Sequence, residues 1–179
     1  MRLGYNTNGL AHHSLPAAIE LLAGIGYQSV AITIDYGILN PYDKQLEHSV
    51  RETQTLLNHH GFSSVIETGA RYLLDPLHKH QPTLLAEEAA DREKRIDFLR
   101  RAIDIAFSLG SDCVSIWSGC LPEGAVRADA MQRLADSLHT VLEHAALEDV
   151  TVAFEPEPGM FIDTMESFAN LLQMADVER

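Results

Sequence analysis

Residues 150–160 read VTVAFEPEPGM, an apolar run that stops at two carboxylates, Glu155 and Glu157. The β-branched and aromatic residues favour a buried strand, and the prolines and the glycine that follow end regular structure. We therefore expect Glu155 at the carboxyl end of a strand. In parallel α/β folds this end of the strands forms the ligand site.

The rest of the chain alternates short apolar runs with longer amphipathic ones. Four earlier strands are predicted over residues 3–6, 29–35, 63–67 and 112–117. Helices are predicted over residues 15–26, 45–60, 84–109 and 128–147, the third with a break near Asp91. A long irregular loop is expected over residues 68–82, and a last helix, capped by Asp163 or Thr164, is expected to run to Arg179.

Five strands that alternate with helices indicate a parallel sheet with helical crossovers. An open sheet would be complete at 179 residues, whereas a closed eight-stranded barrel needs about 250 residues. The first turn, residues 6–11, lacks the glycine pattern of a nucleotide-binding open sheet, and no later turn supplies a phosphate loop. This favours an incomplete barrel over an open sheet.

Side-chain alternation along the strands supports the barrel, because successive strand residues face opposite sides. In the fifth strand, Val152 and Phe154 share one face, while Ala153 and Glu155 share the other. The bulky face suits the helices outside a barrel, and the smaller face suits its interior. Five side chains at strand ends then converge on one mouth: Asn6, Asp35, Glu67, Trp117 and Glu155.

The chain contains three passages that are similar to those of a known family: GYNTNG at 4–9, LLAGIGYQSV at 21–30 and FEPE at 154–157. In this order they resemble the sugar phosphate isomerase/epimerase family, whose members have a xylose-isomerase-like barrel. The resemblance implies an α/β fold, the (β/α)8 TIM barrel. Residues 1–179 would form a single domain, truncated after about five of its βα units.

The resemblance also implies a divalent metal at the carboxyl end of the barrel, with Glu155 matching its first acidic ligand. Mn²⁺ or Mg²⁺ would suit oxygen ligands best, with Zn²⁺ or Co²⁺ as alternatives. The family's other ligands, an Asp, a His and a second Glu, would lie beyond Arg179, and Ala31 stands where many members carry a Glu. Glu155 would hold the metal and also abstract a proton alpha to a carbonyl of a small sugar or sugar phosphate.

Further substrate contacts are expected from Asn6, Glu67, Arg71, Trp117 and Glu157. Glu67 and Arg71 flank the long loop, and loops on this face of a barrel often contact substrate. Trp117 would wall the sugar site, although an aromatic residue at this position is equally expected in the core.

Each polar candidate also has a purely structural interpretation. Glu155 would then cap a helix or bind an arginine, and Glu157, between two prolines, would be a solvated carboxylate. His12 or His13, in the loop after the first strand, is a further candidate metal ligand.

Composition limits the alternatives. A net charge of −13 argues against nucleic acid as partner, which weakens a rival hypothesis of an endonuclease-IV-like phosphodiesterase on the same barrel.

We expect no membrane span, and reduced Cys113 and Cys120 in a cytoplasmic protein. A third hypothesis is an inactive fragment or binding module. Its exposed first and fifth strands would favour aggregation or a homo-oligomer.

Overall fold

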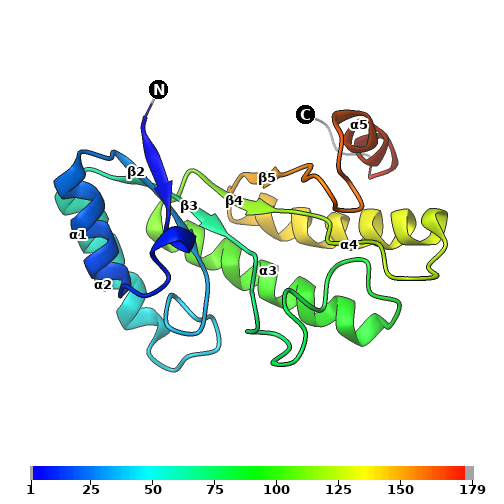
Figure 1. The fold of residues 1–179 in the computed structure, drawn as a ribbon, viewed down its shortest axis with the longest axis horizontal. Coiled ribbons are helices and arrows are strands. Elements are labelled where there is room, and N and C mark those ends of the chain that lie inside the picture. Colours follow the sequence, from blue (N-terminus) through cyan, green and yellow to red (C-terminus); the bar gives the residue numbers. More distant parts are fainter. Residues whose placement is uncertain (1, 176–179) are drawn as a thin grey trace.

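Five parallel strands form a single sheet in the computed structural model, which describes residues 2–175. The strands are neighbours in chain order: β1 (Gly4–Asn6), β2 (Ser29–Thr33), β3 (Ser63–Glu67), β4 (Cys113–Ile116) and β5 (Val152–Phe154). Figure 1 shows the row of strands, with β1 and β5 at the two edges of the sheet. The predicted α/β organisation with five strand–helix units is confirmed.

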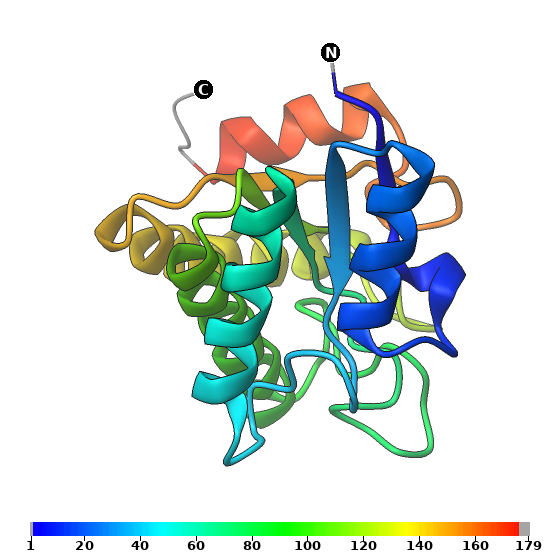
Figure 2. The same cartoon turned by 90° about the vertical axis from the view of Figure 1, so that its left-hand side faces the viewer.

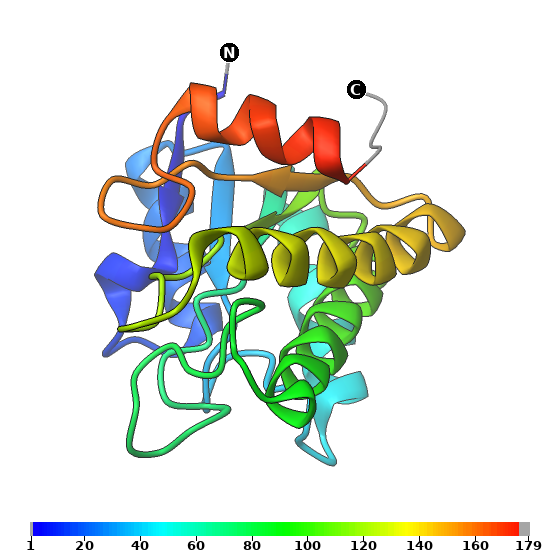
Figure 3. The same cartoon turned by 90° about the vertical axis from the view of Figure 1, so that its right-hand side faces the viewer.

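Helices follow each strand and cover one side of the sheet. They are α1 (Leu15–Ile25), α2 (Leu46–His60), α3 (Ala89–Leu109), α4 (Arg127–Leu147) and α5 (Met165–Met174), and the 3-10 helix η1 (Thr7–Leu10) follows β1 directly. Figure 2 shows α1 and α2 on either side of β2, and the long loops after β2 and β3 gathered at the lower end of the view, toward which β2 points. Figure 3 shows β5 flanked by α4 and α5.

Local sequence signals fix the ends of several helices. Ser14 caps α1 by accepting a hydrogen bond from the backbone N–H of Ala17 at 3.4 Å. Gly26 ends the same helix with φ of 101°, a left-handed conformation that glycine adopts without strain. Thr164 caps α5, and Ser167 completes a reciprocal capping box.

The two faces of the sheet differ as side-chain alternation predicts. On the helix-covered face, Ile32 and Ile66 are fully buried and Val114 is nearly so. On the other face, the register aligns Thr33, Glu67, Ser115 and Ala153 in one row across four strands. The aliphatic face thus forms the core against the helices, and the polar row belongs to the barrel interior.

The expected helix over residues 84–109 is wrong at its start, because α3 begins only at Ala89. Leu84 and Leu85 are buried in the core instead of continuing a helix. The side chain of Arg92 donates to the carbonyl oxygens of Ala86 and Glu87 at 2.8 Å, which satisfies these peptide groups outside the helix. The irregular segment after β3 is therefore longer than predicted.

The boundaries of β2, β5 and α5 also differ from the predicted ones. Strand β2 stops at Thr33, because the chain turns so that Asp35 pairs with Ile38 in an antiparallel bridge. Strand β5 starts at Val152, because the N–H of Val150 bonds to the carbonyl of Ala145 at the end of α4. Helix α5 ends at Met174, short of the predicted end, and residues 176–179 lie outside the described chain.

Cys113 and Cys120 are both free thiols, as expected. Within residues 2–175, no helix is long and apolar enough to cross a membrane.

Candidate active site

A pocket of about 310 Å³ opens at the carboxyl ends of the strands. Its walls come from all five strand ends and from the loops that follow them. The lining residues are Asn6, Asn8, Thr33, Glu67, Gly69, His80, Trp117, Glu155, Glu157 and Met160. The structure thus brings together five of the six side chains that the sequence singled out for binding or catalysis.

Glu155 follows β5 directly, and its backbone N–H donates to the carbonyl of Ile116 at 2.8 Å. The residue is exposed, and its side chain turns to the barrel-interior face. There the hydroxyl of Ser115, a buried residue on β4, donates a hydrogen bond to Oε1 of Glu155. This bond fixes the direction of the carboxylate while the other oxygen remains available to a ligand.

Asn6 is held by the turn that follows β1. Its Oδ1 accepts hydrogen bonds from the backbone N–H of Asn8 at 2.8 Å and from Oγ1 of Thr33 at 2.9 Å. Thr33 is in turn fixed by a bond from its N–H to Oγ1 of the buried Thr7 at 2.9 Å. Because Oδ1 is occupied, the amide nitrogen of Asn6 is the group left to donate to a ligand.

Glu67 is the last residue of β3, and the sheet register places it beside Ser115 of β4. Burial is the largest cause that raises the pKa of Glu67, and the negative charges of Glu155 and Glu157 raise it further. Three carboxylates around one pocket repel one another, and a bound cation would relieve this repulsion. The all-oxygen donor set fits a hard divalent cation such as Mg²⁺ or Mn²⁺.

Trp117 lines the pocket and also packs against a buried side chain behind it. The half-buried ring lines the pocket and meets the ring of His80 edge-on, with centroids 5.6 Å apart. Behind it lies the guanidinium of Arg95, 5.5 Å from the indole centroid, in a fully buried position. Arg95 also donates to the carbonyl of Thr68 at 2.7 Å, so it ties the pocket wall to the chain just after Glu67.

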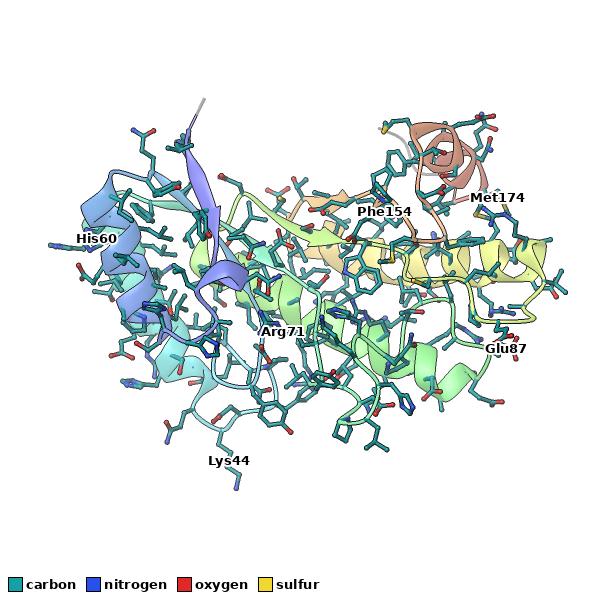
Figure 4. All side chains as sticks on the ribbon, viewed as in Figure 1. Lys44, His60, Arg71, Glu87, Phe154 and Met174 are labelled. Atoms are coloured by element: carbon teal, nitrogen blue, oxygen red, sulfur yellow. The ribbon has the colours of Figure 1, made fainter. Side chains whose placement is uncertain are left out.

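Arg71 lies outside this pocket, in an adjoining cavity that also contains Asp35. Nη1 of Arg71 forms an ion pair with Oδ2 of Asp35 at 3.1 Å, and Nη2 contacts Oδ1 of Asn8. Figure 4 shows Arg71 beside η1, as the contact with Asn8 requires. The expected convergence of Asp35 on the same mouth is thus only approximate, because the turn after β2 moves Asp35 outward.

His12 and His13 are exposed and line neither cavity. Five lining residues were not singled out as site residues from the sequence: Asn8, Thr33, Gly69, His80 and Met160. Nor was Ser115, which orients Glu155 from behind the lining. Alternation along the strands puts Thr33 and Ser115 on the same face as the strand-end candidates, so a signal for these two residues was present in the sequence. Nothing in the sequence indicated His80, which reaches the pocket from the irregular loop.

A second group of possible metal ligands lies at the other end of the sheet. Among residues 2–175, only Asp104, His144 and Glu148 place three ligand atoms within 4.8 Å of one another. Nε2 of His144 lies 2.7 Å from Oδ1 of Asp104, and this ion pair accounts for their proximity. Glu148 precedes β5, whereas Glu155 follows it, so the group is separate from the pocket.

Comparison with known proteins agrees with this architecture. The sequence model of the family described as xylose isomerase-like TIM barrel matches residues 19–179. The chain belongs to this family. A search of curated proteins found no match to the xylose isomerase-like chain.

Solved structures with the same fold include several sugar epimerases. D-allulose 3-epimerase from Methylomonas sp., in complex with D-allulose, superposes with a TM-score of 0.73 at 18% identity, covering 98% of this chain and 59% of its own. The apo 3-keto-D-glucoside 4-epimerase from E. coli gives 0.78 at 12% identity, covering 99% and 65%. A probable 3-DHS dehydratase from Bacillus anthracis gives 0.73 at 18% identity, covering 99% and 60%.

These identities establish a shared fold. The xylose isomerase-like chain spans 59% to 65% of the length of these three structures.

Proposed function

We propose that this chain carries part of the active site of a metal-dependent isomerase or epimerase that acts on a sugar or a sugar derivative. One observation carries the proposal: the Glu155 carboxylate, oriented by Ser115, lies at the carboxyl end of β5 in a xylose isomerase-like barrel. The epimerases among its structural neighbours support the reaction class.

In the proposed reaction, Glu155 removes the proton alpha to the substrate carbonyl. The bond from Ser115 Oγ–H holds one oxygen of the carboxylate and leaves the other to accept this proton. Glu67, whose pKa is raised chiefly by burial, is the candidate that carries a proton to the substrate from the end of β3. The two carboxylates then divide the acid and base roles.

Other pocket residues would position the sugar. The amide nitrogen of Asn6 would donate to a sugar hydroxyl, and Glu157 would accept from one. The face of Trp117 would pack on the C–H groups of the sugar ring. Glu155 would hold the divalent cation, which when bound would polarise the substrate carbonyl.

The test is exchange of the substrate alpha proton with solvent D₂O, followed by NMR, for the protein with Mn²⁺ and a panel of ketoses. Glu155→Gln should slow this exchange by about 10² to 10⁴, the usual contribution of a general base. The matched control is Glu148→Gln, at the opposite end of the sheet, which should leave the rate unchanged. An unchanged exchange rate in Glu155→Gln would rule out Glu155 as the general base and with it the proposed mechanism.

The phosphodiesterase hypothesis is tested separately, by a gel-shift assay with abasic duplex DNA at low salt. With a net charge of −13, the chain should not retard the duplex. Retardation that disappears with added salt would favour the phosphodiesterase.

A further inference from the structure

A second cavity, of about 410 Å³, adjoins the candidate active site. It shares four lining residues with the first pocket, so the two cavities lie side by side: the shared residues are Asn8, Thr33, Gly69 and His80. A ligand seated at Glu155 that reaches past these shared residues would enter the second cavity. The proposed function gives this second cavity no role.

The two adjoining cavities carry opposite charges. The first is lined by three carboxylates and by no lysine or arginine. The second is lined by Arg71 and Lys79 against a single carboxylate, Asp35. The chain as a whole has 26 acidic and 13 basic residues, so an excess of cations in one cavity runs against its composition.

Arg71 is held in place at a cost in backbone energy. Ala70 and Arg71 have φ of 60° and 42°, in the left-handed region that side chains other than glycine disfavour. The N–H of His80 donates to the carbonyl of Arg71, which closes the loop and brings Lys79 to the same cavity. Strain of this kind persists where surrounding contacts fix it, often at ligand sites.

The guanidinium of Arg71 is oriented without being fully used. Its side chain is 27% exposed, and its contacts go to Asp35 and Asn8, which leaves further N–H donors for a ligand. A planar, permanently charged guanidinium suits the oxygens of a phosphate or a carboxylate. The exposed ammonium of Lys79 adds a second positive charge at the same cavity.

We propose that the cavity of Arg71, Lys79 and His80 binds an anionic end group of the substrate. The substrate would then be a phosphorylated or carboxylated sugar, with its reacting carbons at Glu155 and its anionic end at Arg71. This assignment rests on the proposed function for its reaction, but anion binding can be measured without it.

The test is a binding titration without metal, in EDTA, that compares D-fructose 6-phosphate, D-gluconate and D-fructose. The fluorescence of Trp117, the single tryptophan, reports binding. At least one of the anionic sugars should bind ten times or more tightly than D-fructose, and added salt should weaken that preference. Preference for the phosphate or for the carboxylate identifies the end group.

Arg71→Ala and Lys79→Ala should each reduce the preference at least fivefold, and Arg71→Lys should restore part of it. The matched controls Arg51→Ala and Lys44→Ala, at exposed positions outside the cavity, should not change it. If Arg71→Ala fails to fold, the anion preference of Lys79→Ala, a change at an exposed position, and the salt dependence of the wild-type preference test the proposal. Glu155→Gln should slow proton exchange by about 10² to 10⁴ and keep the anion preference, which separates this proposal from the proposed function.

Equal binding of all three sugars would overturn the assignment. So would an anion preference that survives both cavity substitutions.

Discussion

Ser115 and Glu155 lie on neighbouring strand ends, and the hydroxyl of Ser115 donates directly to the carboxylate of Glu155. Ser115 is 3% exposed, so the hydroxyl has a fixed position from which to orient the exposed carboxylate. A buried donor that orients a metal-ligating carboxylate is the arrangement that tunes metal affinity in many sites.

Ser115→Ala should therefore weaken Mn²⁺ binding by about 10- to 100-fold, the usual effect of removing such a supporting bond. The affinity is measured by Mn²⁺ titration with electron paramagnetic resonance. Ser137→Ala, a substitution of a buried serine on α4 away from the pocket, is the control and should leave the affinity unchanged. An equal loss in both variants would mean a general loss of structure.

Glu67 should make the metal-free protein less stable as the pH rises. A carboxyl whose pKa is higher in the folded state binds its proton more tightly there, so the free energy of unfolding falls as pH increases from about 4.5 through the folded-state pKa. Glu67→Gln removes this penalty, and the variant should exceed the wild type in stability at pH 7.5, with a smaller difference near pH 4. Urea unfolding in EDTA measures this, with the exposed Glu87→Gln as control.

Arg95 should be a structural support of the pocket wall. Arg95→Ala should lower the free energy of unfolding by about 3 kcal/mol, because it leaves a cavity and an unpaired carbonyl at Thr68. The emission of Trp117 should also shift to longer wavelength, since its ring loses the group behind it. Arg51→Ala, an exposed change on α2, should do neither. Unaltered emission in Arg95→Ala would contradict the support role.

The cap of α5 should stabilise the helix that lies beside β5. Thr164→Ala should cost about 1 kcal/mol, since the N–H of Ser167 loses its acceptor. Hydrogen exchange should speed up in the first turn of α5 and stay unchanged in α1, which has its own cap at Ser14. Uniform acceleration in both helices would show a global effect instead.

The sequence predicted the parallel sheet, its five strands and the interior position of Glu155, because apolar runs and side-chain alternation are local signals. It could not predict the start of α3, because Leu84 and Leu85 have helix-like spacing but are drawn into the core by tertiary contacts. The position of His80 depends on a loop closed by a bond to Arg71, a contact that no local pattern reveals.

The candidate site was predicted only in part, because local signals locate the strand ends but not the loop contacts. Asn6, Glu67, Trp117 and Glu155 end strands, so the topology alone brings them together. Arg71 sits on a loop, and its exact partner, Asp35, follows from the turn after β2. The loop residues line two different cavities. Side-chain alternation along the strands cannot predict which cavity each loop residue lines.

A divalent cation should bind at Glu155, and Mn²⁺ would reveal even weak binding there by paramagnetic broadening of backbone amide NMR signals. We expect broadening centred on Glu67, Ser115 and Glu155, and its loss in Glu155→Gln but not in Glu148→Gln. Broadening centred on Asp104 and His144, unaffected by Glu155→Gln, would contradict it.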